Sequence, residues 1–230
     1  MIIFGKQCFE YVLCKAPKQI KEIYLSKELN KDIFRRLQQL HVPIFRIDNK
    51  KAQAMAHGRN HQGMFAKIQE IPLLSTKDIL DCHTLVVLSG LTDMGNIGSI
   101  VRTAYALGVC GVLLCDRDYP SLQILEGIFR ASSGALLQMP LGFCVTSLEF
   151  ANQAKMRGFT LLGTGLMPDS AHFSRESLQK WALFIGSEDR GLKQKLLQKM
   201  DIVLHIPMHN NFDSLNVSVA TGILIDRIQR

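Results

Sequence analysis

The stretch IPMHNNFDSLNVSVATG, residues 206–222, decides how the end of this chain folds, because it joins a predicted strand to the last predicted helix. That helix contains four residues that form helices poorly: Ser214, Asn216, Ser218 and Gly222. Asp213 or Ser214 fits the role of an N-cap, which leaves Asn216 and Ser218 without a structural reason. Sequences break local rules of this kind where function requires it, so the stretch predicts a functional site.

Upstream of this stretch, apolar segments alternate with helical patterns from residue 84 onward. The predicted strands are TLVVLSG (84–90), GVLLCD (111–116), LQMPLGF (137–143), FTLLGTG (159–165), WALFIGS (181–187) and DIVLHIPM (201–208). Helical patterns cover about 96–108, 121–133, 146–157, 190–199 and 214–229. Near-continuous apolar strands separated by helices are typical of a parallel sheet with both faces covered, an α/β fold. Ligands of such sheets bind beyond the carboxyl ends of the strands.

Two of these strand ends carry polar residues that suit a site. After the first strand, LTDMGNIGSIVRTAYALG (91–108) opens a helix with two glycines around Asn96 and places Arg102 in its second turn. Such a helix start favours anions, although two glycines there also suit a simple turn, and the dinucleotide fingerprint G-x-G-x-x-G is absent. After the fifth strand, EDRG (188–191) begins with Glu188, which could orient an amide or guanidinium or only favour the helix dipole.

The first third of the chain is a separate, basic module in this interpretation. Residues 1–70 alternate short helices and strands and hold 13 Lys and Arg against 6 Asp and Glu, whereas residues 71–230 hold 14 against 14. The whole net charge of +7 therefore lies on the module, which suggests either a polyanion partner or a solvated basic face. Residues 71–83 form a linker to a domain at 84–230. The candidate polyanion contacts are Lys18, Lys21, Arg35, Arg36, Lys50, Lys51 and Arg59.

Composition narrows the class of protein further. The six cysteines form no C-x-x-C pair, so we expect buried, reduced thiols in a cytoplasmic protein and no metal site. No apolar run reaches the ~18 residues of a membrane span, and the N-terminus does not have the pattern of a secretory signal.

Taken together, LTDMGNIGSIVRTA, IGSEDRG and IPMHNNFDSLNVSVATG resemble, in this order, the three signature motifs of the SpoU/TrmH family of the SPOUT superfamily. The third match is close to verbatim over SLNVSVA. RASSGAL (130–136) is similar to the family's segment after the second helix. FGKQCFEYVL (4–13) and HQGMFAKI (61–68) resemble the ends of the small RNA-binding module that precedes the catalytic domain in many members. The resemblance thus covers nearly the whole chain.

This resemblance implies a fold, a cofactor and an oligomer. The fold is a small N-terminal α/β RNA-binding module followed by a SPOUT α/β domain with a C-terminal trefoil knot. The cofactor, S-adenosylmethionine, binds in the knot, and the enzyme is a homodimer with active sites at the interface. The residues expected to touch the cofactor are Thr164, Gly165, Gly186, Ile206, Met208 and Leu215. Glycine at two of these positions would allow its close approach.

The implied reaction is attack of a ribose 2′-hydroxyl of RNA on the sulfonium methyl group. The catalytic residues carried over from the motifs are Asn96, Arg102, Glu188, Ser214 and Asn216. Because a guanidinium stays protonated, Arg102 would stabilise a developing alkoxide or hold the adjacent phosphate rather than act as a base. Asn96 and Glu188 would hold Arg102 and the substrate in place.

The layout is most similar to bacterial members that methylate a guanosine in 23S rRNA, with tRNA as the alternative substrate. Two residues depart from the family pattern, namely Met94 where proline is usual and Asn210 where glycine is usual. Two other classes of function stay open. One is a non-catalytic RNA-binding or ribosome-assembly protein on the same scaffold, and the other is a nucleotide-dependent oxidoreductase, which the missing dinucleotide fingerprint disfavours.

Overall fold

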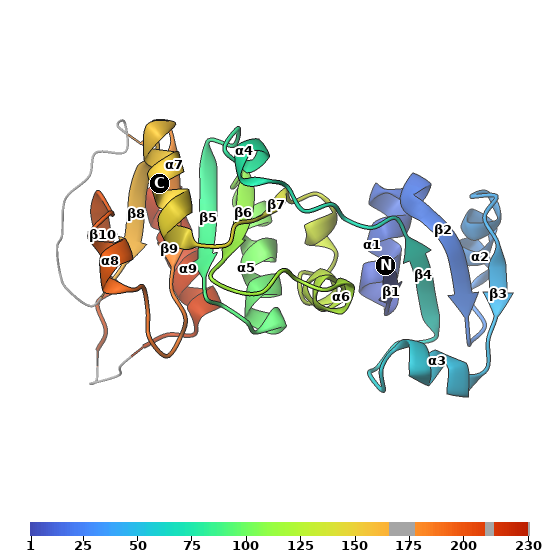
Figure 1. The fold of residues 1–230 in the computed structure, drawn as a ribbon. Helices are drawn as coiled ribbons and strands as arrows, with labels where there is room; N and C mark the ends of the chain where they lie inside the picture. Colours follow the sequence, from blue (N-terminus) through green and yellow to red (C-terminus); the bar gives the residue numbers. More distant parts are fainter. Residues whose placement is uncertain (166–177, 210–213, 230) are drawn as a thin grey trace.

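The computed structural model describes residues 1–165, 178–209 and 214–229. The molecule is elongated, with a four-stranded sheet at one end and a six-stranded sheet at the other (Figure 1). Within the described residues, no helix combines the length and apolar character needed to cross a bilayer.

The four-stranded sheet forms the N-terminal module and has the strand order β1-β4-β2-β3. Its elements are β1 (Ile2–Phe4), α1 (Lys6–Lys15), β2 (Ile20–Leu25), α2 (Lys31–Gln38), β3 (Ile44–Arg46), α3 (Asn49–Met55) and β4 (Met64–Ile68). Strand β4 pairs antiparallel with β1 and β2, while β2 and β3 pair in parallel. The predicted alternation of helices and strands is confirmed. Strand β1 was not predicted, because three residues are too few to show a pattern.

The six-stranded sheet is parallel throughout, in the order β10-β8-β9-β5-β6-β7, as the apolar strands predicted. Its strands are β5 (Thr84–Ser89), β6 (Gly111–Cys115), β7 (Leu141–Phe143), β8 (Thr160–Thr164), β9 (Trp181–Ile185) and β10 (Ile202–Leu204). The helices of this part are α4 (Thr76–Ile79), α5 (Met94–Ala106), α6 (Leu122–Ala131), α7 (Ser147–Met156), α8 (Gln194–Leu197) and α9 (Val217–Gln229).

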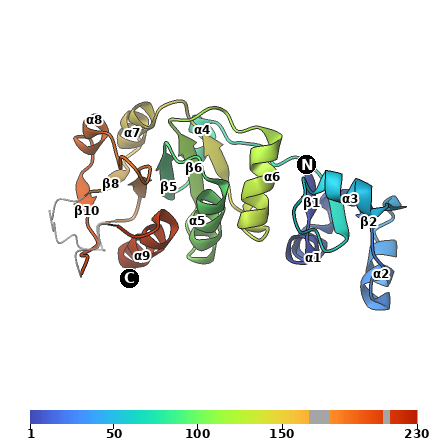
Figure 2. The same ribbon diagram turned by 90° about the horizontal axis from the view of Figure 1, so that it is seen from below.

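These helices form a layer on each face of the six-stranded sheet (Figure 2). Helices α4, α7 and α8 lie on one face, and α5, α6 and α9 lie on the other. Phe150 of α7 and Leu196 of α8 belong to one buried cluster, while Ile100 of α5 and Leu224 of α9 belong to the second. Each such side chain contributes roughly 1.5–3 kcal/mol through burial, so both layers hold the sheet in place.

Short polar side chains fix where six of the helices begin. Each accepts a hydrogen bond from a backbone N–H group of the first helical turn, which would otherwise lack a partner. These N-cap residues are Asn30, Asp48, Ser75, Asp93, Ser121 and Thr146.

Several predicted elements are shorter than expected. Only Leu141–Phe143 of the predicted strand 137–143 is a strand, because a 3₁₀ turn at Ala135–Leu137 and then Pro140 occupy the positions before it. The predicted linker contains α4, and the helix predicted at 190–199 is reduced to α8.

The six thiols are free, but Cys14 and Cys110 are exposed rather than buried.

The trefoil knot stays a prediction. Threading of the chain depends on the path of residues 166–177 and 210–213, and both segments lie outside the described residues.

The module packs directly against the six-stranded part through α6 and the segment after it. The backbone N–H of Ile2 donates to Glu126 Oε1 at 2.6 Å, and the Arg130 guanidinium lies 5.3 Å from the centre of the Phe4 ring. Gly134, at φ 91°, leaves room for the Tyr11 ring, which a Cβ atom would approach to 2.7 Å. The RASSGAL segment thus provides part of the surface on which the module packs.

Candidate active site

Two adjoining cavities lie at the carboxyl ends of β8, β9 and β10, next to the start of α9. Their volumes are about 370 Å³ and about 210 Å³, and both are lined by Thr164, Gly191, Ser214, Leu215 and Ala220. The larger also contacts Gly186 and Glu188, and the smaller also contacts Gly165, Ile206 and Met208. All six residues predicted to touch a cofactor thus line one continuous hollow.

A relay of side-chain hydrogen bonds at the rim of this hollow joins the three sequence motifs. Asn96 Nδ2 donates to Glu188 Oε1 at 2.7 Å, and Asn216 Nδ2 donates to Asn96 Oδ1 at 3.0 Å. The Oδ1 atom of Asn216 accepts from the backbone N–H of Ser218 at 2.9 Å and from its hydroxyl at 2.5 Å. The amide groups of Asn96 and Asn216 are therefore each held in one orientation by residues that lie far away in the sequence.

Asn216 is also the N-cap of α9. Its carbonyl accepts the first helical hydrogen bond, from the N–H of Ala220 at 3.0 Å, and its side chain accepts from the N–H of Ser218. The expectation that the helix starts at Ser214 is wrong, and Asp213 lies outside the described residues. Asn216 thus has the structural role that the sequence left unexplained, because asparagine is among the best N-caps.

Arg102 does not join the relay. Its guanidinium donates from Nη1 to Ser133 Oγ at 3.2 Å and is exposed. Arg102 follows Asn96 by six residues on α5, a rotation of about 600°, so the two side chains point about 120° apart around the helix. Asn96 and Glu188 were expected to hold Arg102 in place, but they are hydrogen-bonded to each other instead.

Two glycines of the motifs are required by the protein's own packing. A Cβ atom on Gly98 would lie 2.3 Å from Ala131 Cβ, so this glycine lets α5 approach α6. A Cβ atom on Gly186 would lie 2.1 Å from the carbonyl carbon of Gly191. The absence of a side chain at Gly186 therefore makes room for the backbone of the same loop at Gly191. In α9, Gly222 faces Thr103 of α5 as a helix-packing glycine, as expected.

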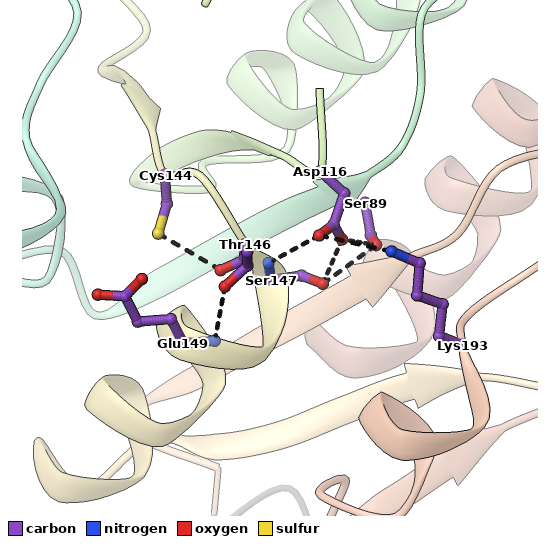
Figure 3. A network of polar contacts seen from close by, with 7 residues as sticks. All are labelled: Ser89, Asp116, Cys144, Thr146, Ser147, Glu149 and Lys193. Carbon is purple, nitrogen blue, oxygen red and sulfur yellow. Dashed lines mark hydrogen bonds and ion pairs between the residues drawn. The ribbon is translucent and has the colours of Figure 1, made fainter. Parts of the chain in front are cut away.

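A polar network beside the cavities was missed by the sequence analysis (Figure 3). Asp116, at φ 54°, follows β6 and accepts from Ser89 Oγ at 2.5 Å and from the Ser147 hydroxyl. The other carboxylate oxygen of Asp116, Oδ1, lies 3.9 Å from Lys193 Nζ. Burial alone would raise the pKa of Asp116, but the hydrogen bonds from Ser147 and Ser89 and the charge of Lys193 together hold it below its usual value. The carboxylate ties the ends of β5 and β6 to the start of α7.

The seven basic residues singled out in the module are all exposed. They lie on several elements of the module rather than on a single helix face. On α2, Leu37 is fully buried while Arg35 and Arg36 face solvent, so this helix packs and presents charge at once. No group of three or more His, Cys, Asp or Glu side chains that could hold a metal ion occurs in the described part of the chain.

Comparison with known proteins gives two family matches that together span most of the chain. Residues 83–226 match the SpoU rRNA Methylase family, and residues 2–73 match the family described as RNA 2'-O ribose methyltransferase substrate binding.

Relatives and solved structures agree with these matches. The 23S rRNA (guanosine-2'-O-)-methyltransferase RlmB of Vibrio vulnificus is 28% identical, over 97% of this chain and 94% of that protein. A putative TrmH family tRNA/rRNA methyltransferase of Staphylococcus haemolyticus is 28% identical, over 100% and 95%. The AdoMet-bound rRNA methyltransferase of Sinorhizobium meliloti has a similar fold, with a TM-score of 0.79 at 24% identity, over 100% of this chain and 86% of that chain.

Proposed function

The chain belongs to the SpoU rRNA Methylase family and is an S-adenosylmethionine-dependent RNA 2′-O-methyltransferase, and we propose that it methylates the ribose of a guanosine in 23S rRNA. The relay from Glu188 through Asn96 to Asn216 carries this proposal, because it assembles the three motifs at the rim of one cavity. The RlmB relatives, whose names give this substrate, align over nearly the full length of both chains, which supports rRNA over tRNA.

The adjoining cavities suit S-adenosylmethionine in size and chemistry. The smaller one has an apolar wall of Leu204, Ile206 and Leu224, which fits the face of a purine, and the larger one has the polar Ser214 and Glu188. The residues that would hold the cofactor are Thr164, Gly165, Gly186, Ile206, Met208 and Leu215. When bound, it supplies an electrophilic methyl group.

The chain's own residues have to position a weak nucleophile and stabilise its charge. The locked amides of Asn96 and Asn216 need no reorganisation when the ribose arrives, which is how preorganised donors lower a barrier. The Arg102 guanidinium stays protonated and cannot accept the hydroxyl proton, which passes to water, and it stabilises the negative charge that develops on the ribose oxygen.

A homodimer is part of the same proposal, with Arg102 of one protomer serving the cavity of its partner. Within one protomer Arg102 is exposed, lines neither cavity and points away from Asn96. Helices α5 and α9 pack together by way of Gly222 and expose the apolar side chains of Tyr105 and Val219, which a second copy would cover. A cytoplasmic location, with the rRNA, belongs to this proposal as well.

The substrate is tested with the purified chain, radiolabelled S-adenosylmethionine, 23S rRNA and total tRNA. We expect label in 23S rRNA, at a guanosine that resists alkaline hydrolysis on its 3′ side. Label in tRNA alone would move the substrate to the alternative. Cofactor binding without transfer to either RNA would favour a non-catalytic RNA-binding protein, and binding of NAD instead would favour an oxidoreductase.

Two substitutions separate the capping role of Asn216 from its role in the relay. Asn216→Ala removes both the cap and the amide, so we expect a loss of about 1 kcal/mol in the free energy of unfolding together with a sharp loss of methyl transfer. Asn216→Ser keeps an oxygen for the cap but is too short to reach Asn96, so stability should stay near native while transfer falls. Urea unfolding and transfer assays measure the two effects. Native turnover in the folded serine variant would show that the relay has no catalytic role.

The basic module is expected to hold RNA through phosphate contacts, whose affinity weakens steeply with salt. Reversing Arg35 and Arg36 to glutamate in the full chain should lower RNA affinity and reduce the slope of log affinity against log salt by about 2, if both contact phosphate. The matched control reverses two exposed lysines, Lys195 in α8 and Lys199 just after it, with the same change in net charge. Equal effects of both pairs would mean that the module's charge is only a solvated face.

A further inference from the structure

Each strand of the module's sheet contributes one aromatic side chain to a single row across the sheet. Phe4 on β1 lies opposite Phe65 on β4, and Phe65 lies opposite Tyr24 on β2. Tyr24 in turn lies in register with Phe45 on β3. Residues in register across neighbouring strands share a face, so the four rings follow the strand order β1-β4-β2-β3 from one edge to the other.

The two ends of this aromatic row are in different environments. At the inner end, Phe4 and Phe65 are buried in one cluster with Ala52 of α3 and with Ala56, the residue after this helix, and the Arg130 guanidinium lies over the Phe4 ring. At the outer end, Phe45 lies on the edge strand and is 45% exposed. Only the outer end is open to a ligand.

The open end is also held in a fixed orientation. The rings of Phe45 and Tyr24 stack, with centroids 5.3 Å apart and planes inclined by 25°. The Tyr24 hydroxyl donates to Glu22, whose carboxylate pairs with Lys67 Nζ at 2.7 Å. Tyr24 is thus fixed at its far end, and the negative charge of Glu22 on this face is compensated. A flat apolar ring is presented on a rigid support, and packing inside the module does not require the exposed half of Phe45.

Two lysines follow this end of the row closely along the chain. Helix α3, whose Ala52 packs on the aromatic face, begins three residues after β3, and its first turn carries the exposed Lys50 and Lys51. The module as a whole carries the chain's entire excess of positive charge. An aromatic ring open on one face, next to cations, is the chemistry that binds unpaired nucleotides, because bases stack on the ring while phosphates meet the cations.

We propose that Phe45 stacks on an unpaired base of the RNA substrate, with Lys50 and Lys51 on the flanking phosphates. This inference rests on the proposed function for the presence of RNA, and it adds that the module recognises single-stranded nucleotides. Strand β3 lies at the opposite end of the molecule from β8, β9 and β10, which line the cavities (Figure 1). The base held by Phe45 is therefore remote from the cofactor cavities of the same chain, and we expect Phe45 to serve affinity rather than chemistry.

Binding of an unstructured 12-nucleotide RNA and of a duplex of the same length tests this proposal on the full chain. Phe45→Ala should weaken binding of the single strand by roughly 5- to 100-fold, as loss of one stacked base does, and leave the duplex nearly unaffected. Phe45→Leu keeps an apolar side chain but no ring, so it should behave like Phe45→Ala. The matched control is Tyr119→Ala, since Tyr119 is 66% exposed, packs edge-on against Phe143 and lies outside the module.

Phe45→Trp supplies a second readout that does not depend on activity. The single native tryptophan, Trp181, is buried in the six-stranded sheet, so the added indole would report from an exposed position. We expect the single strand to quench this fluorescence and the duplex to leave it unchanged.

Several results would overturn the proposal. They are native affinity in Phe45→Leu, equal losses in Phe45→Ala and Tyr119→Ala, or an unquenched indole in a variant that still binds the single strand. A native chain that binds neither short RNA but labels 23S rRNA would overturn this inference alone, whereas a chain that transfers label to no RNA would overturn the proposed function on which the inference rests.

Discussion

Arg102→Ala is expected to lower the rate of methyl transfer by about 10²- to 10³-fold, the usual effect of removing one donor that stabilises a developing oxyanion. Affinity for S-adenosylmethionine should stay native, because the proposed partner of Arg102 is the ribose oxygen rather than the cofactor. Arg102→Lys should fail almost as badly, since an ammonium does not reproduce the planar fork of a guanidinium. Single-turnover rates and cofactor titrations measure these effects separately. Native turnover in a folded Arg102→Ala protein would end the assignment.

Ser133→Ala is the matched control for this substitution. It removes the hydroxyl that accepts from Arg102 but leaves the guanidinium in place, so only a small loss of rate is expected. A loss as large as that of Arg102→Ala would mean that the position of the arginine on the RASSGAL segment, rather than its charge, limits the reaction.

Mixing two inactive variants tests whether Arg102 acts across the proposed homodimer. In that homodimer, Arg102→Ala and Asn216→Ala would each disable both sites. If Arg102 serves the partner's cavity, a mixed dimer contains one site in which both residues are native, and activity should return on mixing. If both residues serve the same protomer's cavity, each site of the mixed dimer carries one of the two substitutions, so no activity should return.

The parallel sheet was predictable because its strands are nearly continuous apolar runs, such as Thr84–Ser89. Such runs are typical of strands that helices cover on both faces. The start of α9 was not predictable from local sequence. Asp213, Ser214 and Asn216 can each cap a helix, and the amide of Asn216 is also bonded to Asn96, which lies 120 residues away and does not enter a local pattern.

The motifs named Asn96, Glu188 and Asn216, which the structure brings together, but their pairing was not predictable. Spacing alone does not show that Asn96 faces Glu188 while Arg102 turns to Ser133. Asp116 was missed for a related reason. A single acid after a strand has no local pattern, and its partners come from separate elements.

Gly186→Ala is expected to lower the free energy of unfolding by about 3 kcal/mol, at the upper end of the cost of overpacking. The added Cβ would lie 2.1 Å from the carbonyl carbon and 2.4 Å from the carbonyl oxygen of Gly191, and 2.4 Å from the backbone nitrogen of Leu192. All three are backbone atoms, so no side chain can move aside to make room. The loop that carries Glu188 must shift instead, which should break the hydrogen bond to Asn96 and abolish methyl transfer.

The same substitution distinguishes two reasons for a glycine at this position. If glycine is needed only for a close approach of the cofactor, Gly186→Ala should unfold like the native chain and lose only S-adenosylmethionine affinity. If the loop's own backbone needs the space, stability must fall in the absence of any cofactor, and urea unfolding of the ligand-free protein measures this directly. Gly222→Ala is the control, because its Cβ would meet only the Thr103 methyl group, at 3.2 Å, within a helix that favours alanine. Its stability should stay within about 1 kcal/mol of native.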